Sequence, residues 1–298
     1  MRVLDLYCGA GMAADGYYDA GFDVVGWDVR HQPSYPFQFH RGSALDALED
    51  RAYLREFDLI HASPPCQAHT RAKHLRDAQG GKSKYDDLLT PTLELLRDCG
   101  VPWVVENVVG APGMEGAVIE CGSAYGLKVR RHRLFLASFP LVGSGCKHKE
   151  QGKPVGVYHT MGDTCKGVCK KTGKLVIGGS TAKTVEEGRD AMGVTRQITW
   201  NELKEGFPPA YTRHVGEQAM AYLLQRGPTS GSRVRLPNVP HVRQEPDPQG
   251  VDRRCAGQPA CDRGLLQRMH WDAGRRDPVA HQETAHPGRG SSVRHGKP

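Results

Sequence analysis

Short apolar runs alternate with polar and glycine-rich stretches through the N-terminal half of the chain. Residues 2–7, 22–27, 57–62 and 102–108 form four such runs, each bounded by charged, glycine or proline residues. Runs of this length and makeup are typical of strands buried inside a sheet. Residues 15–20 form a helical stretch that Gly21 ends, so residues 2–28 predict one strand–helix–strand unit of an α/β protein.

A glycine turn joins the first predicted strand to its helix. Gly9-x-Gly11-x-x-Ala14 matches a nucleotide-binding fingerprint, and Asp28 stands at the tip of the second strand, where a carboxylate binds ribose hydroxyls. Alone, this pattern fits an NAD-dependent oxidoreductase as readily as an S-adenosylmethionine enzyme. A turn that serves packing only is a third interpretation.

A cysteine follows the third predicted strand. Pro64 and Pro65 have fixed φ angles and hold Cys66 in one orientation at the edge of the sheet where ligands bind, which makes it a candidate nucleophile. A lone cysteine is more often a buried apolar residue. Activity as a nucleophile requires surroundings that lower the thiol pKa, and we expect neighbouring strand ends and helix termini to do so.

Charged residues mark the ends of two further segments. Glu106 closes the fourth predicted strand, although a solvated loop carboxylate is the commoner case. Arg131 and Arg133 face one side of an extended segment, and Arg130 and His132 face the other.

Five short motifs occur in an order that resembles the DNA cytosine-5 methyltransferase family. They are Asp5-x-Tyr7-x-Gly9-x-Gly11, Pro65-Cys66-Gln67, Glu106-Asn107-Val108, Arg131-x-Arg133, and Arg196-x-Ile198-Thr199 with Gly206-Phe207-Pro208. The resemblance spans roughly residues 1 to 224. The short middle region and the compressed C-terminal motif resemble the small phage-borne or orphan members more than the large members associated with restriction-modification systems.

The resemblance implies a Rossmann-like methyltransferase fold, a mixed sheet with helices on both faces, and S-adenosylmethionine as cofactor. It implies that Cys66 adds to C6 of a flipped cytosine in double-stranded DNA, that Glu106 holds N3 and the exocyclic amine, and that Arg131 and Arg133 bind the base carbonyl or nearby backbone. Burial is expected to raise the pKa of Glu106 and keep it partly protonated. The implied cofactor residues are Asp5, Tyr7, Gly9, Gly11, Asp28, Ser43, Asp46 and Pro64.

Three positions depart from the family pattern. Ser43 stands where the family usually has an aspartate, and Asp46 is the candidate replacement. Val129 replaces a frequent glutamine, and Glu217 a common asparagine. These departures keep open a non-catalytic DNA-binding relative. A tRNA cytosine methyltransferase is the other alternative, whereas an NAD oxidoreductase leaves Cys66 and Glu106 unexplained.

The motifs divide the chain into four regions. We expect a catalytic region at 1–138, a small target-recognition region at 139–192, a return to the catalytic part at 193–226 and a disordered Arg-rich tail at 227–298. Residues 68–86 read as a mobile basic lid. In the recognition region, Cys146-x-His148 and Cys165-x-x-x-Cys169 have metal-ligand types, but their spacing matches no strong zinc pattern, so no metal site is predicted.

Charge and cysteine content favour a cytoplasmic DNA-binding enzyme. The net charge is +7, and residues 227–298 hold 12 Lys+Arg against 7 Asp+Glu, so the tail carries +5 of it. Nine cysteines, an odd number, suit a reducing compartment, and no apolar run is long enough to span a membrane. No protein partner is inferred. No motif indicates the target sequence, the oligomeric state or the existence of a cognate restriction enzyme.

Overall fold

The computed structural model describes residues 1–68, 86–158, 160–162, 164–168 and 175–226, and all of them belong to one compact unit, Met1–Pro248. The predicted tail, Cys169 and nearly all of the predicted lid lie outside the described residues. The division into regions therefore stays a prediction.

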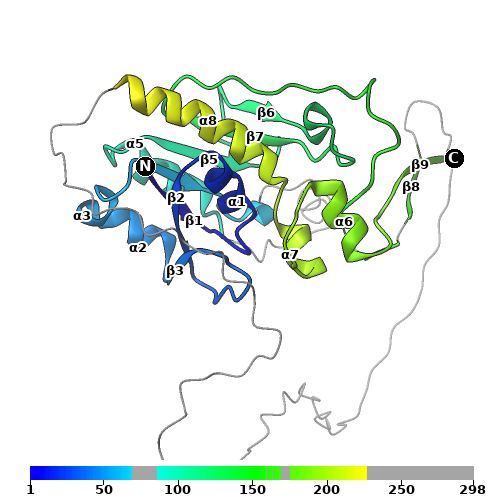
Figure 1. The fold of residues 1–298 in the computed structure, drawn as a ribbon, viewed down its shortest axis with the longest axis horizontal. Coiled ribbons are helices and arrows are strands. Elements are labelled where there is room, and N and C mark those ends of the chain that lie inside the picture. Colours follow the sequence, from blue (N-terminus) through cyan, green and yellow to red (C-terminus); the bar gives the residue numbers. More distant parts are fainter. Residues whose placement is uncertain (69–85, 159, 163, 169–174, 227–298) are drawn as a thin grey trace, which may run out of the picture. The chain divides into compact units, whose positions relative to one another are not determined.

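A single mixed sheet forms the centre of the fold (Figure 1). Its seven strands lie in the order β3-β2-β1-β4-β5-β7-β6. Neighbours from β3 to β5 pair in parallel, whereas β7 is antiparallel to both β5 and β6. The strands are β1 (Arg2–Leu6), β2 (Asp23–Asp28), β3 (Gln38–Arg41), β4 (Leu59–Ala62), β5 (Trp103–Asn107), β6 (Val118–Glu120) and β7 (Arg133–Ala137).

Helices cover both faces of the sheet. α1 (Met12–Asp19) and α8 (Pro209–Gln225) pack on one face, and α2 (Ala44–Glu49), α3 (Arg51–Leu54) and α5 (Leu89–Arg97) pack on the other. Side chains alternate along β1, so Val3 joins the α1–α8 core while Leu4 and Leu6 join the α2–α5 core. The predicted Rossmann-like α/β class with helices on both faces is confirmed.

The helix that returns the chain to the sheet packs closely against α1. An added Cβ at Gly16 would lie 2.1 Å from the Pro209 carbonyl oxygen, so only glycine permits this approach. The Thr212 hydroxyl also donates to the Ala13 carbonyl at 2.9 Å. Helix α8 begins at Pro209, because proline is well suited to the first helical position.

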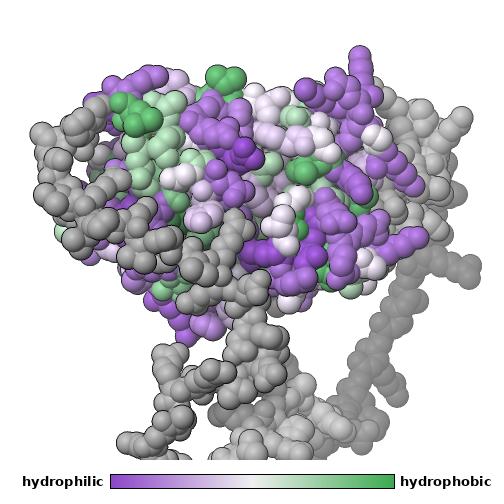
Figure 2. Space-filling model, viewed as in Figure 1, coloured by the Kyte–Doolittle hydropathy of each residue, from purple (hydrophilic) through white to green (hydrophobic). Residues whose placement is uncertain are grey.

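A third apolar cluster lies under α6 (Val185–Met192) and α7 (Trp200–Glu205) and includes Met12, Val129 and Val157. Strands β8 (Thr164–Val168) and β9 (Leu175–Ser180) form a separate antiparallel hairpin. On the face in Figure 2, most of the described surface is hydrophilic and the apolar patches are small. Among the described residues, no helix combines the length and apolarity needed to cross a bilayer.

Candidate active site

A pocket of about 590 Å³ opens at the edge of the sheet where the parallel strands end. That size is typical of small-molecule and cofactor sites. Ten of the predicted site residues line it, namely Asp5, Tyr7, Gly9, Asp28, Ser43, Pro64, Cys66, Glu106, Arg131 and Arg133. Gly11 and Asp46 do not line it. The strand ends therefore bring together residues that are far apart in the sequence.

The glycine turn forms one wall of the pocket. Gly9 has φ 49° and donates its N–H to Asp28 Oδ2 at 3.1 Å, while Asp28 Oδ1 accepts from the Arg30 N–H at 2.8 Å. Gly11 has φ 84° and precedes α1, and a Cβ there would lie 2.8 Å from the Pro36 ring. Gly11 therefore shapes the turn, and Asp28 both braces the turn and faces the pocket.

Asp5 is a buried carboxyl with spare hydrogen-bonding capacity. Its Oδ2 accepts from the Tyr35 hydroxyl at 3.4 Å, whereas its Oδ1 is buried and has no partner. Burial raises the pKa of Asp5 well above its usual range, and the negative charges of Asp28 and Asp15 add to this effect. The unpartnered buried Oδ1 of Asp5 is free to accept a hydrogen bond from a donor group of a ligand.

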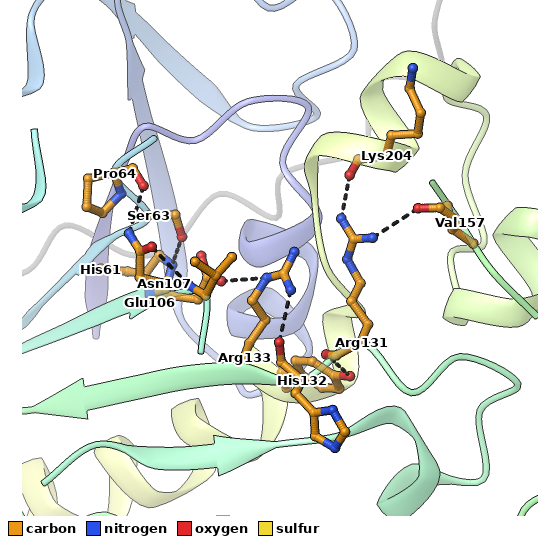
Figure 3. A network of polar contacts seen from close by, with 12 residues as sticks. His61, Ser63, Pro64, Glu106, Asn107, Arg131, His132, Arg133, Val157 and Lys204 are labelled. Atoms are coloured by element: carbon orange, nitrogen blue, oxygen red, sulfur yellow. Dashed lines mark hydrogen bonds and ion pairs between the residues drawn. The ribbon is translucent and has the colours of Figure 1, made fainter. Parts of the chain in front are cut away.

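Asn107, the last residue of β5, fixes the turn that carries the cysteine (Figure 3). Its Nδ2 donates to the Pro64 carbonyl at 3.1 Å, and its Oδ1 accepts from the Val108 N–H at 2.9 Å. Cys66 then begins the short 3-10 helix η1 (Cys66–Ala68) and is half-buried in the pocket. Two prolines and an amide clamp therefore hold the thiol in place.

The expectation that strand ends and helix termini lower the Cys66 pKa is wrong for this state of the protein. Burial raises the pKa of the thiol, and the charge of Glu106 raises it further. Arg133 and Arg131 act in the opposite direction but do not outweigh burial. The thiol of the free protein is therefore protonated at neutral pH.

Glu106 and Arg133 form a buried ion pair. Arg133 Nε lies 2.9 Å from Glu106 Oε1, and the side chains are 13% and 8% exposed. Burial raises the pKa of Glu106, as expected from the sequence, although the charge of Arg133 and a hydrogen bond from Ser63 oppose the rise. The carboxyl therefore takes up a proton more readily than an exposed glutamate does.

Behind Glu106, three side chains form a hydrogen-bonded chain that sequence reasoning missed. His61 Nδ1 lies 3.0 Å from the Tyr17 hydroxyl, and His61 Nε2 lies 2.8 Å from Ser63 Oγ. Burial lowers the pKa of His61 to about 3, so the ring is neutral. Tyr17 then donates to Nδ1, Nε2–H donates to Ser63, and the Ser63 hydroxyl donates to Glu106. The one available signal was a histidine within an apolar strand.

Arg131 joins three parts of the chain (Figure 3). Its guanidinium donates to the Val157 carbonyl at 3.1 Å and to the Lys204 carbonyl, and it lies 5.1 Å from the centre of the Tyr158 ring. Burial lowers the pKa of Arg131 to about 10, and the like charge of Arg133 contributes. Arg131 therefore ties α7 and the segment around 157 to the pocket, while Arg133 faces Glu106.

The two arginines lie on one side of the chain and the His132 ring on the other, as the sequence pattern predicts (Figure 3). Arg131 achieves this with φ 33°, a value that residues other than glycine seldom adopt. The Tyr211 hydroxyl supports this backbone because it donates to the Arg131 carbonyl at 3.0 Å.

The segment that returns from α6 closes the glycine-turn side of the pocket. Arg196 pairs with Asp15 at 2.7 Å, donates to the Ser34 carbonyl at 2.8 Å and also donates to the Ala10 carbonyl. This contact explains the arginine of the Arg196-x-Ile198-Thr199 motif. Three residues of α7 that the sequence did not single out also line the pocket, namely Glu202, Lys204 and Glu205.

Comparison with known proteins gives similarities of low identity. No family model matches the sequence, and no curated protein matches it. DNMT2 of Spodoptera frugiperda, as a mutant, has 15% identity and a TM-score of 0.46 over 75% of this chain and 99% of that one. The S. pombe Dnmt2 methyltransferase has 14% identity and a TM-score of 0.47 over 75% of this chain and 99% of that one. The Entamoeba histolytica methyltransferase EhMeth has 13% identity and a TM-score of 0.45 over 76% and 98%. At these values none of the similarities assigns a family or an activity to the chain.

Proposed function

We propose that this protein is an S-adenosylmethionine-dependent methyltransferase that methylates C5 of cytosine in DNA. The observation that carries the proposal is one pocket that holds a positioned thiol, Cys66, the Glu106–Arg133 pair and the Gly9–Asp28 cradle. Five motifs in the order of the cytosine-5 methyltransferase family support this reading.

The cradle fits S-adenosylmethionine. Asp28 lies where a ribose diol binds in nucleotide folds, and the unpartnered Oδ1 of Asp5 is an acceptor for the amino group of the methionine moiety. Ser43 lines the same wall. When bound, the cofactor supplies an electrophilic methyl group.

The remaining residues suit activation of a cytosine. We propose that the Cys66 thiol gives up its proton to water as its sulfur forms a bond to C6, which makes C5 nucleophilic, while Glu106 in its protonated form donates its proton to N3. Arg133 stabilises the negative charge that develops on the ring during this addition. C5 then forms a bond to the methyl group, and S-adenosylhomocysteine is the second product. Water removes the C5 proton, the S–C6 bond breaks to release Cys66, and N3 returns its proton to Glu106. Because C6 is hidden in a duplex, the base must be flipped into the pocket.

Two departures from the family motifs have structural roles outside this chemistry. The Ser43 side chain caps α2 by accepting from the Asp46 N–H at 3.4 Å. Glu217 forms an exposed i,i+4 pair with Arg213 at 3.0 Å and does not line the pocket. Neither position removes a reacting group, which supports an active enzyme over a non-catalytic DNA-binding relative.

We further propose that residues 139–192 select the target, because they follow the pocket arginines and Val157 binds Arg131 directly. Lys147, Lys149 and Lys153 supply positive charge for phosphate contacts in the described part of this region. A tRNA substrate would use the same pocket chemistry, so the experiment must examine both nucleic acids.

The test is bisulfite sequencing of DNA and RNA from a host without cytosine-5 methylation that expresses the protein. New methylcytosine in DNA at a recurring sequence is expected for the wild type. It is also expected for Cys99→Ser, a matched control that changes a buried thiol in the core around α2 and α5. Cys66→Ser should give none. Methylation confined to RNA, or equal methylation with Cys66→Ser, would contradict the proposal.

A further inference from the structure

Four metal-ligating side chains meet behind the pocket arginines, outside the site described above. Their ligand atoms all lie within 4.8 Å of one another, and the residues are Cys121, His132, Cys146 and His148. Cys121 precedes the 3-10 helix η2 (Gly122–Tyr125), His132 precedes β7, and the other two lie in the loop after β7. We propose that these residues bind a structural zinc ion.

The spacing of the atoms is close to that of a tetrahedral Cys2His2 zinc site. Cys121 Sγ lies 3.3 Å from His148 Nε2, and His132 Nε2 lies 3.2 Å from Cys146 Sγ. Zn–S bonds of about 2.3 Å and Zn–N bonds of about 2.0–2.1 Å place sulfur and nitrogen about 3.6 Å apart around a tetrahedral ion. Small side-chain shifts therefore suffice to coordinate the metal. Two thiolates and two neutral imidazoles also balance the charge of Zn²⁺.

A supporting hydrogen bond orients one of the sulfur ligands. Ser123 Oγ accepts from the Lys147 N–H at 2.9 Å, so its own hydrogen is free to donate to Cys121 Sγ, which lies 3.1 Å away. A hydroxyl that donates to the sulfur is the arrangement expected beside a metal-bound thiolate. The same serine joins Cys121 to the loop that carries Cys146 and His148.

The metal has a clear structural use at this position. The segment after β7 is also held by polar contacts from Ser144 to Glu120, from Lys147 to Ser123, and from Gln151 to the Leu127 and Val129 carbonyls. His132 stands between Arg131 and Arg133, and its ring points away from the pocket (Figure 3). Zinc bound by His132 would fix this strand from behind and keep both arginines aimed at the pocket. We therefore assign zinc a structural role, in which it positions the two arginines and takes no part in the methyl transfer.

Sequence spacing alone does not reveal this site, because Cys146-x-His148 is the one short pair among ligands spread over residues 121–148. Among the described residues, the structure brings Cys121 and His132 to this pair.

The first test is metal analysis of the full-length chain, produced without a histidine tag and dialysed against a weak chelator. We expect about one zinc per chain, falling below about one tenth in Cys146→Ser and in His148→Gln. Because the chain has 14 histidines, Cys99→Ser and His31→Gln serve as matched controls that should keep the zinc. Equal zinc in all variants, or none in the wild type, would overturn the proposal.

Two measurements on the wild type avoid any ambiguity from a misfolded variant. Replacement of zinc by Co²⁺ should give the intense visible bands of a tetrahedral complex and sulfur-to-cobalt charge-transfer absorption. Thiol titration of the denatured, unreduced protein should find all nine cysteines free. A weak octahedral cobalt spectrum, or a disulfide between Cys121 and Cys146, would refute the site whether or not the protein methylates DNA.

Discussion

Replacement of Arg133 by glutamine should destabilise the protein in a strongly pH-dependent way. The substitution removes the charge that lies 2.9 Å from Glu106, where both side chains are nearly buried. Unit charges about 4 Å apart attract by about 4 kcal/mol at an effective dielectric of about 20, and loss of one partner of a buried pair costs about 3–5 kcal/mol. Glu106 limits this loss because it can take up a proton.

The sign of the pH dependence follows from the Glu106 pKa. Burial already raises this pKa, and Arg133 is the strongest influence that lowers it, so the variant raises it further. Near pH 4, close to the ordinary pKa of about 4.3, the carboxyl is largely protonated in both folded proteins and the penalty is smallest, about 1 kcal/mol. As the pH rises through the wild-type pKa the penalty grows, and it levels off at about 3 kcal/mol above the pKa of the variant.

Urea unfolding of the wild type and Arg133→Gln between pH 4 and 9 measures this difference. Arg133→Lys retains the charge and should lose less than half as much stability. In a Glu106→Gln background the Arg133→Gln penalty should fall to about 1 kcal/mol and lose its pH dependence, because no carboxylate is left unpaired. A penalty that does not change with pH, or two single penalties that simply add, would refute the buried-pair reasoning.

Three further substitutions test other parts of the site. Ser63→Ala removes the hydroxyl that donates to Glu106, so it should raise the pKa of Glu106 and cost about 1–2 kcal/mol in urea unfolding. Asp28→Ala should weaken S-adenosylmethionine binding by about 10-fold or more in calorimetry, and unchanged affinity together with NADH binding to the wild type would contradict the cofactor assignment. Gly16→Ala should destabilise by more than about 2 kcal/mol in thermal unfolding although alanine favours helix, because its Cβ meets the Pro209 carbonyl; a stabilised variant would show that α1 and α8 are not in close contact.

Residues at strand ends were predictable from the sequence. Cys66, Glu106 and Asp28 each follow an apolar run, and the ends of parallel strands meet at one edge of a sheet whatever lies between them in the chain. Strand alternation correctly predicted that Arg131 and Arg133 lie on one side, although Arg131 precedes β7 and reaches that side with φ 33° instead of an extended conformation.

Contacts made through the fold were not predictable. The Arg131 guanidinium is held by two backbone carbonyls, and a sequence cannot show which carbonyls will face it. The Cys66 thiol is protonated because burial raises its pKa more than two nearby arginines lower it. The outcome depends on distances that the sequence does not give. Cys121 and His132 meet Cys146 only because β6 and β7 pair, so no local motif marks that cluster.

The most direct test of the account is covalent trapping on duplex DNA that carries 5-fluorocytosine at the methylated position, with S-adenosylmethionine present. Fluorine at C5 cannot leave as a proton does, so the bond between Cys66 and C6 should persist. We predict a denaturation-resistant protein–DNA adduct that maps to Cys66, absent with Cys66→Ser and retained with Cys99→Ser. An undiminished adduct with Cys66→Ser, or none with the wild type on DNA that it methylates, would contradict the central claim.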